Sequence, residues 1–247
     1  MYYLRRIQIE FSKFRKKIYK FYIKKLLGKK NGIEFGGPTA LFSDKNFNFQ
    51  IYNYLKLDGA NLFNENYFQQ PKNEKFEYGN STGKQFEVDV SSYSSLQILK
   101  KKYGFILNSH LIEHLANPLN SLKLWHGVLE EDGYLISVVP DYRYSFDRKR
   151  PLTQLEHFIQ DYQNKVSEND TTHVDEQLRL HDWELGGMDN FEELVKKNEE
   201  TRVLHHHTFT KKTLIELLEL ANFTTIISFK IDKLNIVNIA KKINDCK

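Results

Sequence analysis

Short apolar stretches alternate with longer amphipathic ones from residue 31 to the end of the chain, which is the pattern of a sheet with crossover helices. We expect strands near Gly32–Phe35, Ile51–Leu57, Gln85–Val88, Phe105–Asn108, Tyr134–Val139, Thr224–Phe229 and Leu234–Ile239. We expect helices near Ser94–Lys102, Pro118–Leu129 and Lys211–Leu220, and Thr210 can cap the last of them. Residues 66–84 lack such a period and suggest an irregular polar loop. Seven strands at this spacing predict an α/β fold with a doubly wound, mostly parallel sheet.

A long polar stretch interrupts this alternation. About 65 residues, 142–207, separate the fifth expected strand from the last expected helix, and they are rich in His, Asp, Glu and Asn. A plain connection in a compact domain is much shorter than this. We therefore expect a helical or loop insert that caps one side of the sheet.

The first 30 residues carry apolar side chains at alternating spacings of three and four, which is typical of one face of a helix. This stripe consists of Leu4, Ile7, Phe11, Phe14, Ile18 and Phe21. Eleven Lys and Arg against one acid give the segment a charge of +10, so the remainder carries −6 of a total of +4. Either the stripe docks on the following domain, or the basic helix lies on an anionic membrane surface. We expect a leader helix at 1–30 and one domain, with its insert, at 31–247.

The composition limits the kinds of molecule that we expect the protein to bind. The mildly acidic body argues against nucleic acid, because binding phosphates requires positive charge on the domain itself. The single cysteine, Cys246, cannot pair within the chain, and no apolar run approaches the roughly 20 residues that span a bilayer. We expect a cytoplasmic protein, with peripheral contact at the inner membrane surface if the leader binds lipid.

The segment NGIEFGGPTALF places Gly36 and Gly37 at the carboxyl end of the first expected strand. Ligands of open parallel sheets bind at this edge, and glycine lets the backbone approach them closely. A strand followed by Gly-Gly-Pro is, taken alone, as typical of a plain turn as of a cofactor loop. Two acids, Asp58 and Asp89, follow the next two expected strands, so three strand ends bring polar groups to one edge.

Residues 103–141 carry a more specific motif. Ser109, His110, Glu113 and His114 form Ser-His-x-x-Glu-His after the fourth expected strand, and Asn117-Pro118, Asp132-Gly133 and Val139-Pro140 follow. In these residues the chain resembles the class I S-adenosylmethionine-dependent methyltransferases. The resemblance covers residues 31–141 well and the last helix and two strands more loosely. DRKRPLTQLEH, RLHDWELGG and LHHHTF in the insert are similar to segments of methyltransferases associated with bacterial surface polysaccharide synthesis.

The resemblance implies a seven-stranded Rossmann-like methyltransferase sheet with an inserted acceptor-side cap, and S-adenosyl-L-methionine as cofactor. It implies that Glu34 contacts the methionine amino group, that Gly36 and Gly37 pass under the cofactor, that Asp58 holds the ribose, that Asp89 with the backbone of Val90 reads adenine, and that Ser109 and His110 line the methionine side. The segment LDGAN also offers Asn61 for the ribose.

This chain has Pro38-Thr39 where the family's turn carries a further glycine. That departure keeps open a non-catalytic binding or regulatory module with the same fold. A dinucleotide dehydrogenase fits less well, because the Gly-x-Gly-x-x-Gly spacing is missing.

Methyl transfer to oxygen needs a positioned acceptor and a base, and histidine suits that role near neutral pH. The candidate catalytic residues are His110, Asp141, His181 and His206. Arg148 and Arg150 can clamp a phosphate or carboxylate of the acceptor, and His181 and His206 are expected to contact it. We expect O-methylation of a sugar or phosphorylated precursor of a surface glycan, with a small-molecule, sugar-nucleotide or glycan acceptor.

The insert also offers metal-ligand side chains. His173, Glu176, His181 and Asp182, together with His205–His207, could hold a divalent ion. Their spacing matches no tight metal signature, however, so a histidine-rich acceptor pocket or a buried hydrogen-bond network is favoured and no metal is expected.

Overall fold

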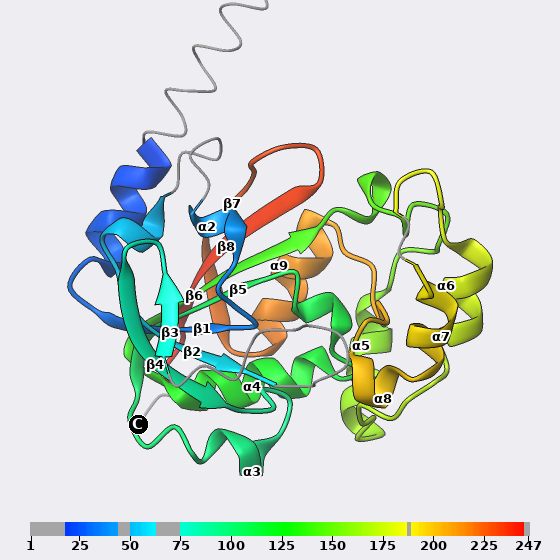
Figure 1. The fold of residues 1–247 in the computed structure, drawn as a ribbon, viewed down its shortest axis with the longest axis horizontal. Helices are drawn as coiled ribbons and strands as arrows, with labels where there is room; N and C mark the ends of the chain where they lie inside the picture. Colours follow the sequence, from blue (N-terminus) through cyan, green and yellow to red (C-terminus); the bar gives the residue numbers. More distant parts are fainter. Residues whose placement is uncertain (1–17, 44–49, 63–74, 187–188, 245–247) are drawn as a thin grey trace, which may run out of the picture.

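An eight-stranded sheet runs through the centre of the protein in the order β3-β4-β2-β1-β5-β6-β8-β7 (Figure 1). This computed structural model describes residues 18–43, 50–62, 75–186 and 189–244. The strands are β1 (Asn31–Phe35), β2 (Lys56–Asn61), β3 (Lys75–Tyr78), β4 (Ser81–Glu87), β5 (Tyr103–Ser109), β6 (Leu129–Pro140), β7 (Phe223–Lys230) and β8 (Asn235–Lys242). The prediction of a mostly parallel α/β sheet is confirmed, but the count of seven strands is wrong.

The eighth strand comes from residues expected to form a loop. β3 and β4 make an antiparallel hairpin in which Tyr78 faces Ser81, so residues 75–84 are strand and turn. Strands β4, β2, β1, β5 and β6 are parallel, whereas β8 runs antiparallel to both of its neighbours, β6 and β7. The strand order reverses between β1 and β5, and this is the position where sheets of this type bind ligands.

Two other elements differ from expectation. Residues Ile51–Asn53 form a 3-10 helix, η1, and β2 begins five residues later than predicted, at Lys56. The helix expected at Ser94–Lys102 is the single turn α3 (Tyr93–Leu96). In contrast, α9 (Lys211–Leu220) has the predicted bounds, and Thr210 caps it in a reciprocal arrangement with Thr213.

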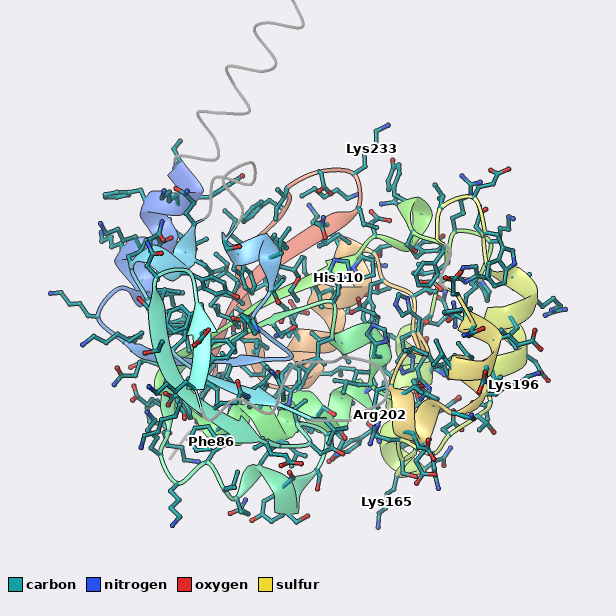
Figure 2. The ribbon with its side chains drawn as sticks, viewed as in Figure 1. Phe86, His110, Lys165, Lys196, Arg202 and Lys233 are labelled. Atoms are coloured by element: carbon teal, nitrogen blue, oxygen red, sulfur yellow. The ribbon has the colours of Figure 1, made fainter. Side chains whose placement is uncertain are left out.

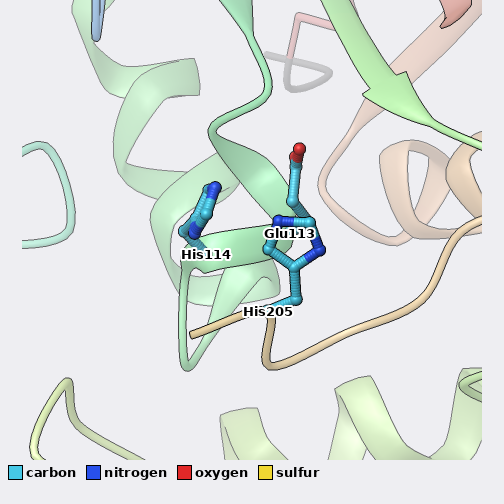
Figure 3. A group of neighbouring side chains, drawn as sticks. All are labelled: Glu113, His114 and His205. Atoms are coloured by element: carbon cyan, nitrogen blue, oxygen red, sulfur yellow. The ribbon is translucent and has the colours of Figure 1, made fainter. Parts of the chain in front are cut away.

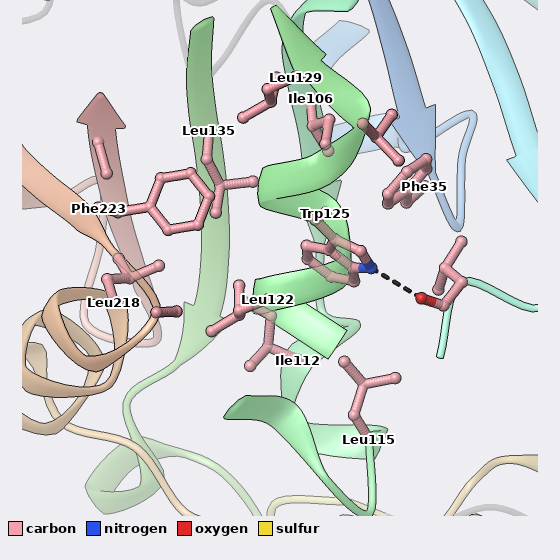
Figure 4. Packing of buried hydrophobic residues seen from close by; sticks show 14 of the residues in the cluster. Phe35, Ile106, Ile112, Leu115, Leu122, Trp125, Leu129, Leu135, Leu218 and Phe223 are labelled. Carbon is pink, nitrogen blue, oxygen red and sulfur yellow. Dashed lines mark hydrogen bonds between the residues drawn. The ribbon is translucent and has the colours of Figure 1, made fainter. Parts of the chain in front are cut away.

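One face of the sheet packs against α4 (Pro118–Val128) and α9. Trp125 of α4 is fully buried in this cluster, lies edge-on to Phe35 at 5.2 Å between ring centroids, and donates its indole N–H to the carbonyl of Val90 (Figure 4). Successive side chains of β5 point to opposite faces of the sheet, so Ile106 belongs to this face whereas Phe105 and Leu107 belong to the other. This two-sided burial fixes the register that delivers the strand ends to the site.

The opposite face is covered by α2 (Ala40–Ser43), η1 and a helix over residues 18–27. Ile23 and Leu27 of that helix are buried against the sheet, whereas Ile18 and Phe21 are 48% and 70% exposed. Residues 18–27 thus pack on the domain through Ile23 and Leu27, which are not part of the predicted stripe. The stripe residues Leu4, Ile7, Phe11 and Phe14 lie outside the described residues.

Residues between β6 and α9 form a separate lobe beside the sheet (Figure 1). It contains η3 (Tyr142–Tyr144), α5 (Leu155–Gln163), α6 (Val174–Leu180), α7 (Phe191–Lys196) and α8 (Asn198–Thr201). The lobe has an apolar cluster of its own, which includes Val174, Phe191 and Val195. We call this lobe the cap. No helix among the described residues has the length and apolar character needed to cross a membrane.

Candidate active site

A pocket lies at the carboxyl ends of the parallel strands, between the sheet and the cap. It encloses about 950 Å³ of empty space, part of it open to solvent. The sheet side contributes residues at or after the ends of β1, β2, β4 and β5, namely Gly36, Ala60, Asn61, Leu62, Val88, Asp89, Val90, Ser91, His110, Leu111, His114 and Leu115, and the cap contributes Glu168, Glu200, Thr201 and Arg202. His110 and Arg202 mark its two sides in Figure 2. The pocket therefore occupies the switch point of the sheet, where ligands of open α/β sheets bind.

The glycine turn forms one wall. Gly36 has φ +76°, a left-handed conformation that favours glycine, and its N–H donates to the carbonyl of Ala60 at 3.1 Å. Asn61 holds the next residue, since its Nδ2 donates to the carbonyl of Gly37 at 2.5 Å. Gly36 lines the pocket as predicted, whereas Gly37 only supports the turn.

Glu34 supports this turn from behind and does not line the pocket. Its side chain is fully buried, and its two oxygens accept hydrogen bonds from the Tyr52 hydroxyl at 2.6 Å and the Thr39 N–H at 3.0 Å. Burial raises the pKa of Glu34 to about 7. The expected contact with a methionine amino group is not formed from this position, because both oxygens point into the turn.

Asp58 lies toward the amino end of β2 and outside the pocket, which is at the carboxyl ends of the strands. It accepts hydrogen bonds from the Tyr103 hydroxyl at 2.9 Å and the Lys84 N–H at 3.0 Å, and it pairs with Lys101 at 2.8 Å. Burial opposes its ionisation, but these partners hold its pKa below the usual value. Because β2 ends at Asn61, Asn61 stands in the pocket instead, with its Oδ1 buried and without a hydrogen-bond partner.

Asp89 reaches the pocket as predicted, and the cap contacts it there. Its Oδ1 accepts from the N–H and hydroxyl of Ser91, and its Oδ2 lies 3.2 Å from Nη2 of Arg202. Arg202 also pairs with Glu168 at 2.6 Å. Val90 lines the pocket beside Asp89, whereas Ser109 is buried beneath it with an unpaired hydroxyl.

His110 is the titratable side chain that β5 presents to the pocket. It follows the strand with φ +50°, and its ring bridges Asn235 and Glu113, with Nε2 2.7 Å from Asn235 Oδ1 and Nδ1 3.3 Å from Glu113 Oε1. Asp232 accepts from Nδ2 of Asn235, so the Asn235 oxygen faces the histidine and Nε2 donates to it. Burial opposes the charged imidazolium, but Glu113 outweighs it and raises the pKa of His110.

Glu113 belongs to a buried group beneath the pocket (Figure 3). Ligand atoms of Glu113, His114 and His205 lie within 4.8 Å of one another. His205 donates from Nδ1 to Asp147 at 2.6 Å, and burial lowers the pKa of His114 to about 4. Glu113 keeps its charge in this setting because His110 and the neighbouring histidines outweigh the effect of burial, and its pKa is lowered.

The two predicted acceptor arginines serve the cap instead. Arg150 is buried and donates to Asp147, Glu176, Gln177 and the carbonyls of His205 and His206. Arg148 pairs with Asp182 and Glu184. Neither arginine lines the pocket. Their charges were visible in the sequence, but their buried acidic partners were not.

The remaining predicted catalytic residues are also structural. Asp141 is fully buried, where Arg143 and Lys230 pair with it and lower its pKa although burial opposes ionisation. His181 is stacked on Phe146, with Nε2 2.9 Å from the Gly186 carbonyl. His206 contacts Asn198 at 3.1 Å, and burial lowers its pKa to about 3. None of the three lines the pocket.

The side chains considered for a metal are not assembled as one set. Glu176 pairs with Arg150, Asp182 pairs with Lys149 as well as Arg148, and His181 packs among aromatic rings. Sequence reasoning missed Glu113 as a partner of His110 and missed Glu168 and Arg202 entirely. The Ser-His-x-x-Glu-His spacing already places Glu113 three residues after His110. No feature of the sequence points to Glu168 or Arg202.

Several solved methyltransferases resemble the fold. The 1,6-didemethyltoxoflavin-N1-methyltransferase of Burkholderia thailandensis, solved with S-adenosylhomocysteine, is 13% identical over 93% of this chain and 78% of its own, with a TM-score of 0.47. Human N-acetylserotonin methyltransferase, solved with S-adenosylmethionine, is 10% identical over 95% of this chain and 55% of its own, with a TM-score of 0.47. The CurJ carbon methyltransferase is 12% identical over 94% of this chain and 54% of its own, with a TM-score of 0.46.

At the level of sequence, no curated protein matches the chain. One family does match, and it is described as a methyltransferase domain. The match extends over residues 5–227 and so includes the pocket and the cap. Because it spans nearly the whole sequence, this chain belongs to that family of methyltransferase domains.

Proposed function

We propose that the pocket binds S-adenosyl-L-methionine and that the protein transfers its methyl group to a hydroxyl of a sugar-containing or phosphorylated precursor of a surface glycan. The observation that supports cofactor binding is the pocket itself, at the switch point and lined by the residues that end β1, β2, β4 and β5. Its residues fit the cofactor: Gly36 leaves the backbone accessible, and the unpaired Oδ1 of Asn61 can accept from a ribose hydroxyl. When bound, the cofactor supplies an electrophilic methyl group.

In this assignment Asn61, rather than Asp58, contacts the ribose. Asp89 and Val90 contact the adenine. His110 stands on the methionine side, where Glu113 raises its pKa although burial opposes the charged form. Arg202 orients the Asp89 carboxylate from the cap and closes that end. Glu34 acts only through the turn it supports.

His110 is also our candidate for the base. Glu113 holds Nδ1, and Nε2 faces the oxygen of Asn235, which occupies the position that an acceptor hydroxyl would take. An acceptor that displaces Asn235 would give its proton to Nε2 while its oxygen gains the methyl group, in the manner of a base oriented by a carboxylate. This role requires neutral His110, so it becomes available as pH rises through the pKa of that residue.

The acceptor class is supported by the similarity of the insert segments to methyltransferases of surface polysaccharide synthesis. That support is associative, because function belongs to the site rather than to the fold. A panel of sugar nucleotides, glycosyl phosphates and short glycans, assayed with labelled cofactor, tests it. Methyl transfer to amines alone would overturn the hydroxyl assignment.

Isothermal titration calorimetry with S-adenosylmethionine and S-adenosylhomocysteine tests the cofactor, with NADH as the control ligand. We expect micromolar binding of the first two, at least tenfold weaker binding in Asp89→Asn, and unchanged binding in Asp58→Asn, whose side chain lies outside the pocket. Equal loss in both variants would contradict the pocket assignment. No binding by the wild type would favour the non-catalytic module.

A further inference from the structure

A second histidine cluster lies behind the pocket wall, where helix α5 meets the extended segment that leads to α9. His157 and Asp161 are four residues apart on α5, so they lie on one face of the helix. Asp161 Oδ2 is 3.5 Å from His157 Nε2 and 3.6 Å from His207 Nε2. Ligand atoms of these three residues lie within 4.8 Å of one another, and His173 Nε2 is 3.1 Å from His157 Nε2.

The carboxylate of this cluster, Asp161, lacks a Lys or Arg partner among the described residues. Asp161 Oδ2 is buried and has no hydrogen-bond partner, and no Lys or Arg of the described chain forms an ion pair with Asp161. His207 is 1% exposed, and its Nδ1 also lacks a partner. The Asp170 carboxylate also acts on Asp161 and makes its ionisation less favourable, so this buried carboxylate is costly unless a cation or a proton neutralises it.

The spacing of the atoms suits a metal ion. Tetrahedral sites with metal–ligand bonds of about 2.0–2.2 Å place neighbouring ligand atoms roughly 3.3–3.5 Å apart. Of the two distances from Asp161 Oδ2, 3.5 Å lies at the upper end of this range and 3.6 Å lies just above it. Imidazole with carboxylate is a donor set that zinc and other divalent transition metals accept. His157 is partly exposed and offers a path for entry.

The group of Glu113, His114 and His205 differs in this respect. There His205 already donates to Asp147, and His110 lies beside the Glu113 carboxylate. His205 and His110 thus already have other protein partners, Asp147 and Asn235, whereas Nδ1 of His207 has none.

We propose that His157, Asp161 and His207 form a binding site for a divalent transition-metal ion of the zinc type, with His173 adjacent as a further ligand. The ion would tie α5 to the segment before α9. It would act next to the pocket wall, because His207 lies beside Ala116, whose N–H donates to Glu168 of the pocket. This inference does not depend on the cofactor or the acceptor.

The test is a titration of the full chain, treated with chelator and dialysed, with Zn²⁺ and separately with Co²⁺, in the absence of cofactor. We expect one equivalent of Zn²⁺ per chain, visible absorption bands of tetrahedral Co²⁺, and a higher melting temperature with zinc. His157→Ala removes a partly exposed ligand and should weaken zinc binding at least tenfold and abolish the zinc-dependent stabilisation. The matched control His126→Ala, on the far side of α4, should behave as wild type.

Three results would overturn the proposal. These are no stoichiometric binding by the wild type, equal binding by His157→Ala, and loss of the ion in Glu113→Gln while His157→Ala retains it. The last result would place the metal in the neighbouring group. Because binding is measured without cofactor, failure here leaves the methyltransferase assignment unaffected.

Discussion

Arg202 of the cap contacts Asp89 at the end of β4, with Nη2 3.2 Å from Oδ2. These residues are 113 positions apart, and their contact joins the two walls of the pocket. A second ion pair from Arg202 to Glu168 fixes the guanidinium, so the carboxylate that we assign to adenine is oriented before any ligand arrives.

Replacing Arg202 by glutamine should weaken cofactor binding about tenfold, because an oriented charged contact of this kind contributes about 1.4 kcal/mol. Calorimetry measures the loss, and hydrogen exchange should show faster opening of residues 198–204. Lys196→Gln on the exposed face of α7 is the matched charge control. Unchanged affinity in Arg202→Gln would mean that the cap does not orient Asp89.

The pH dependence of catalysis should report His110. Glu113 raises the pKa of His110 in spite of burial, so the rate should rise with pH with a midpoint above the ordinary value of 6.5. His110→Asn should lower turnover about 100-fold and keep most cofactor affinity. Glu113→Gln should move the midpoint to lower pH, which a merely structural role for Glu113 would not do. A flat profile in the wild type would exclude His110 as the base.

Glu34 should make the folded state sensitive to pH. Its folded-state pKa of about 7 lies above the ordinary 4.5, so its contribution to stability is complete below pH 4.5 and is lost as pH rises through about 7. Over that window the loss is about 3 kcal/mol. Glu34→Gln cannot titrate, and its stability relative to wild type should increase by about that amount between pH 4.5 and pH 8, measured by urea unfolding. A constant difference would show that Glu34 stays ionised in the turn.

Substitutions in the leader should distinguish its packing on the domain from contact with a membrane. Ile23→Ala should destabilise the fold by about 2–4 kcal/mol, since the side chain is buried against the sheet. The double variant Ile18→Ser/Phe21→Ser removes exposed apolar side chains and should leave unfolding unchanged. If the leader also contacts membranes, this double variant should sediment less with anionic vesicles than wild type does. Equal sedimentation of both proteins would argue against lipid contact through these two residues.

Hydrophobic periodicity predicted the elements whose residues also have an intrinsic preference for that helix or strand. Helix α9 has an apolar stripe and a threonine cap, and it begins and ends where predicted. Strand β2 was displaced because its sequence, KLDGAN, contains residues that strands disfavour, whereas the apolar IYN before it forms a turn of 3-10 helix. Gly59 is required there, because a Cβ would stand 2.0 Å from the ring of Phe76. Tertiary packing of this kind leaves no periodic signal.

The same displacement explains the error in the site. Moving the end of β2 forward replaces Asp58 by Asn61 at the pocket and sends Asp58 to Lys101 at the other end of the strand. Gly36, Asp89, Val90 and His110 lie at the pocket, because β1 ends where predicted and β4 and β5 end within one residue of the predicted positions. The arginines and histidines of the cap were misassigned, since buried partners far away in sequence decide whether a charged side chain is available to a ligand.

The side chains of the three consecutive histidines before α9 have different polar partners. His205 donates to Asp147, His206 contacts Asn198, and His207 faces Asp161 and the Ala116 carbonyl. Deleting one of the three would leave a protein that still contains two consecutive histidines. Such a one-residue length change would nevertheless place each remaining imidazole among the contacts that the adjacent histidine makes in this structure. Genetic tolerance to deletion should therefore be lowest where the sequence looks most redundant.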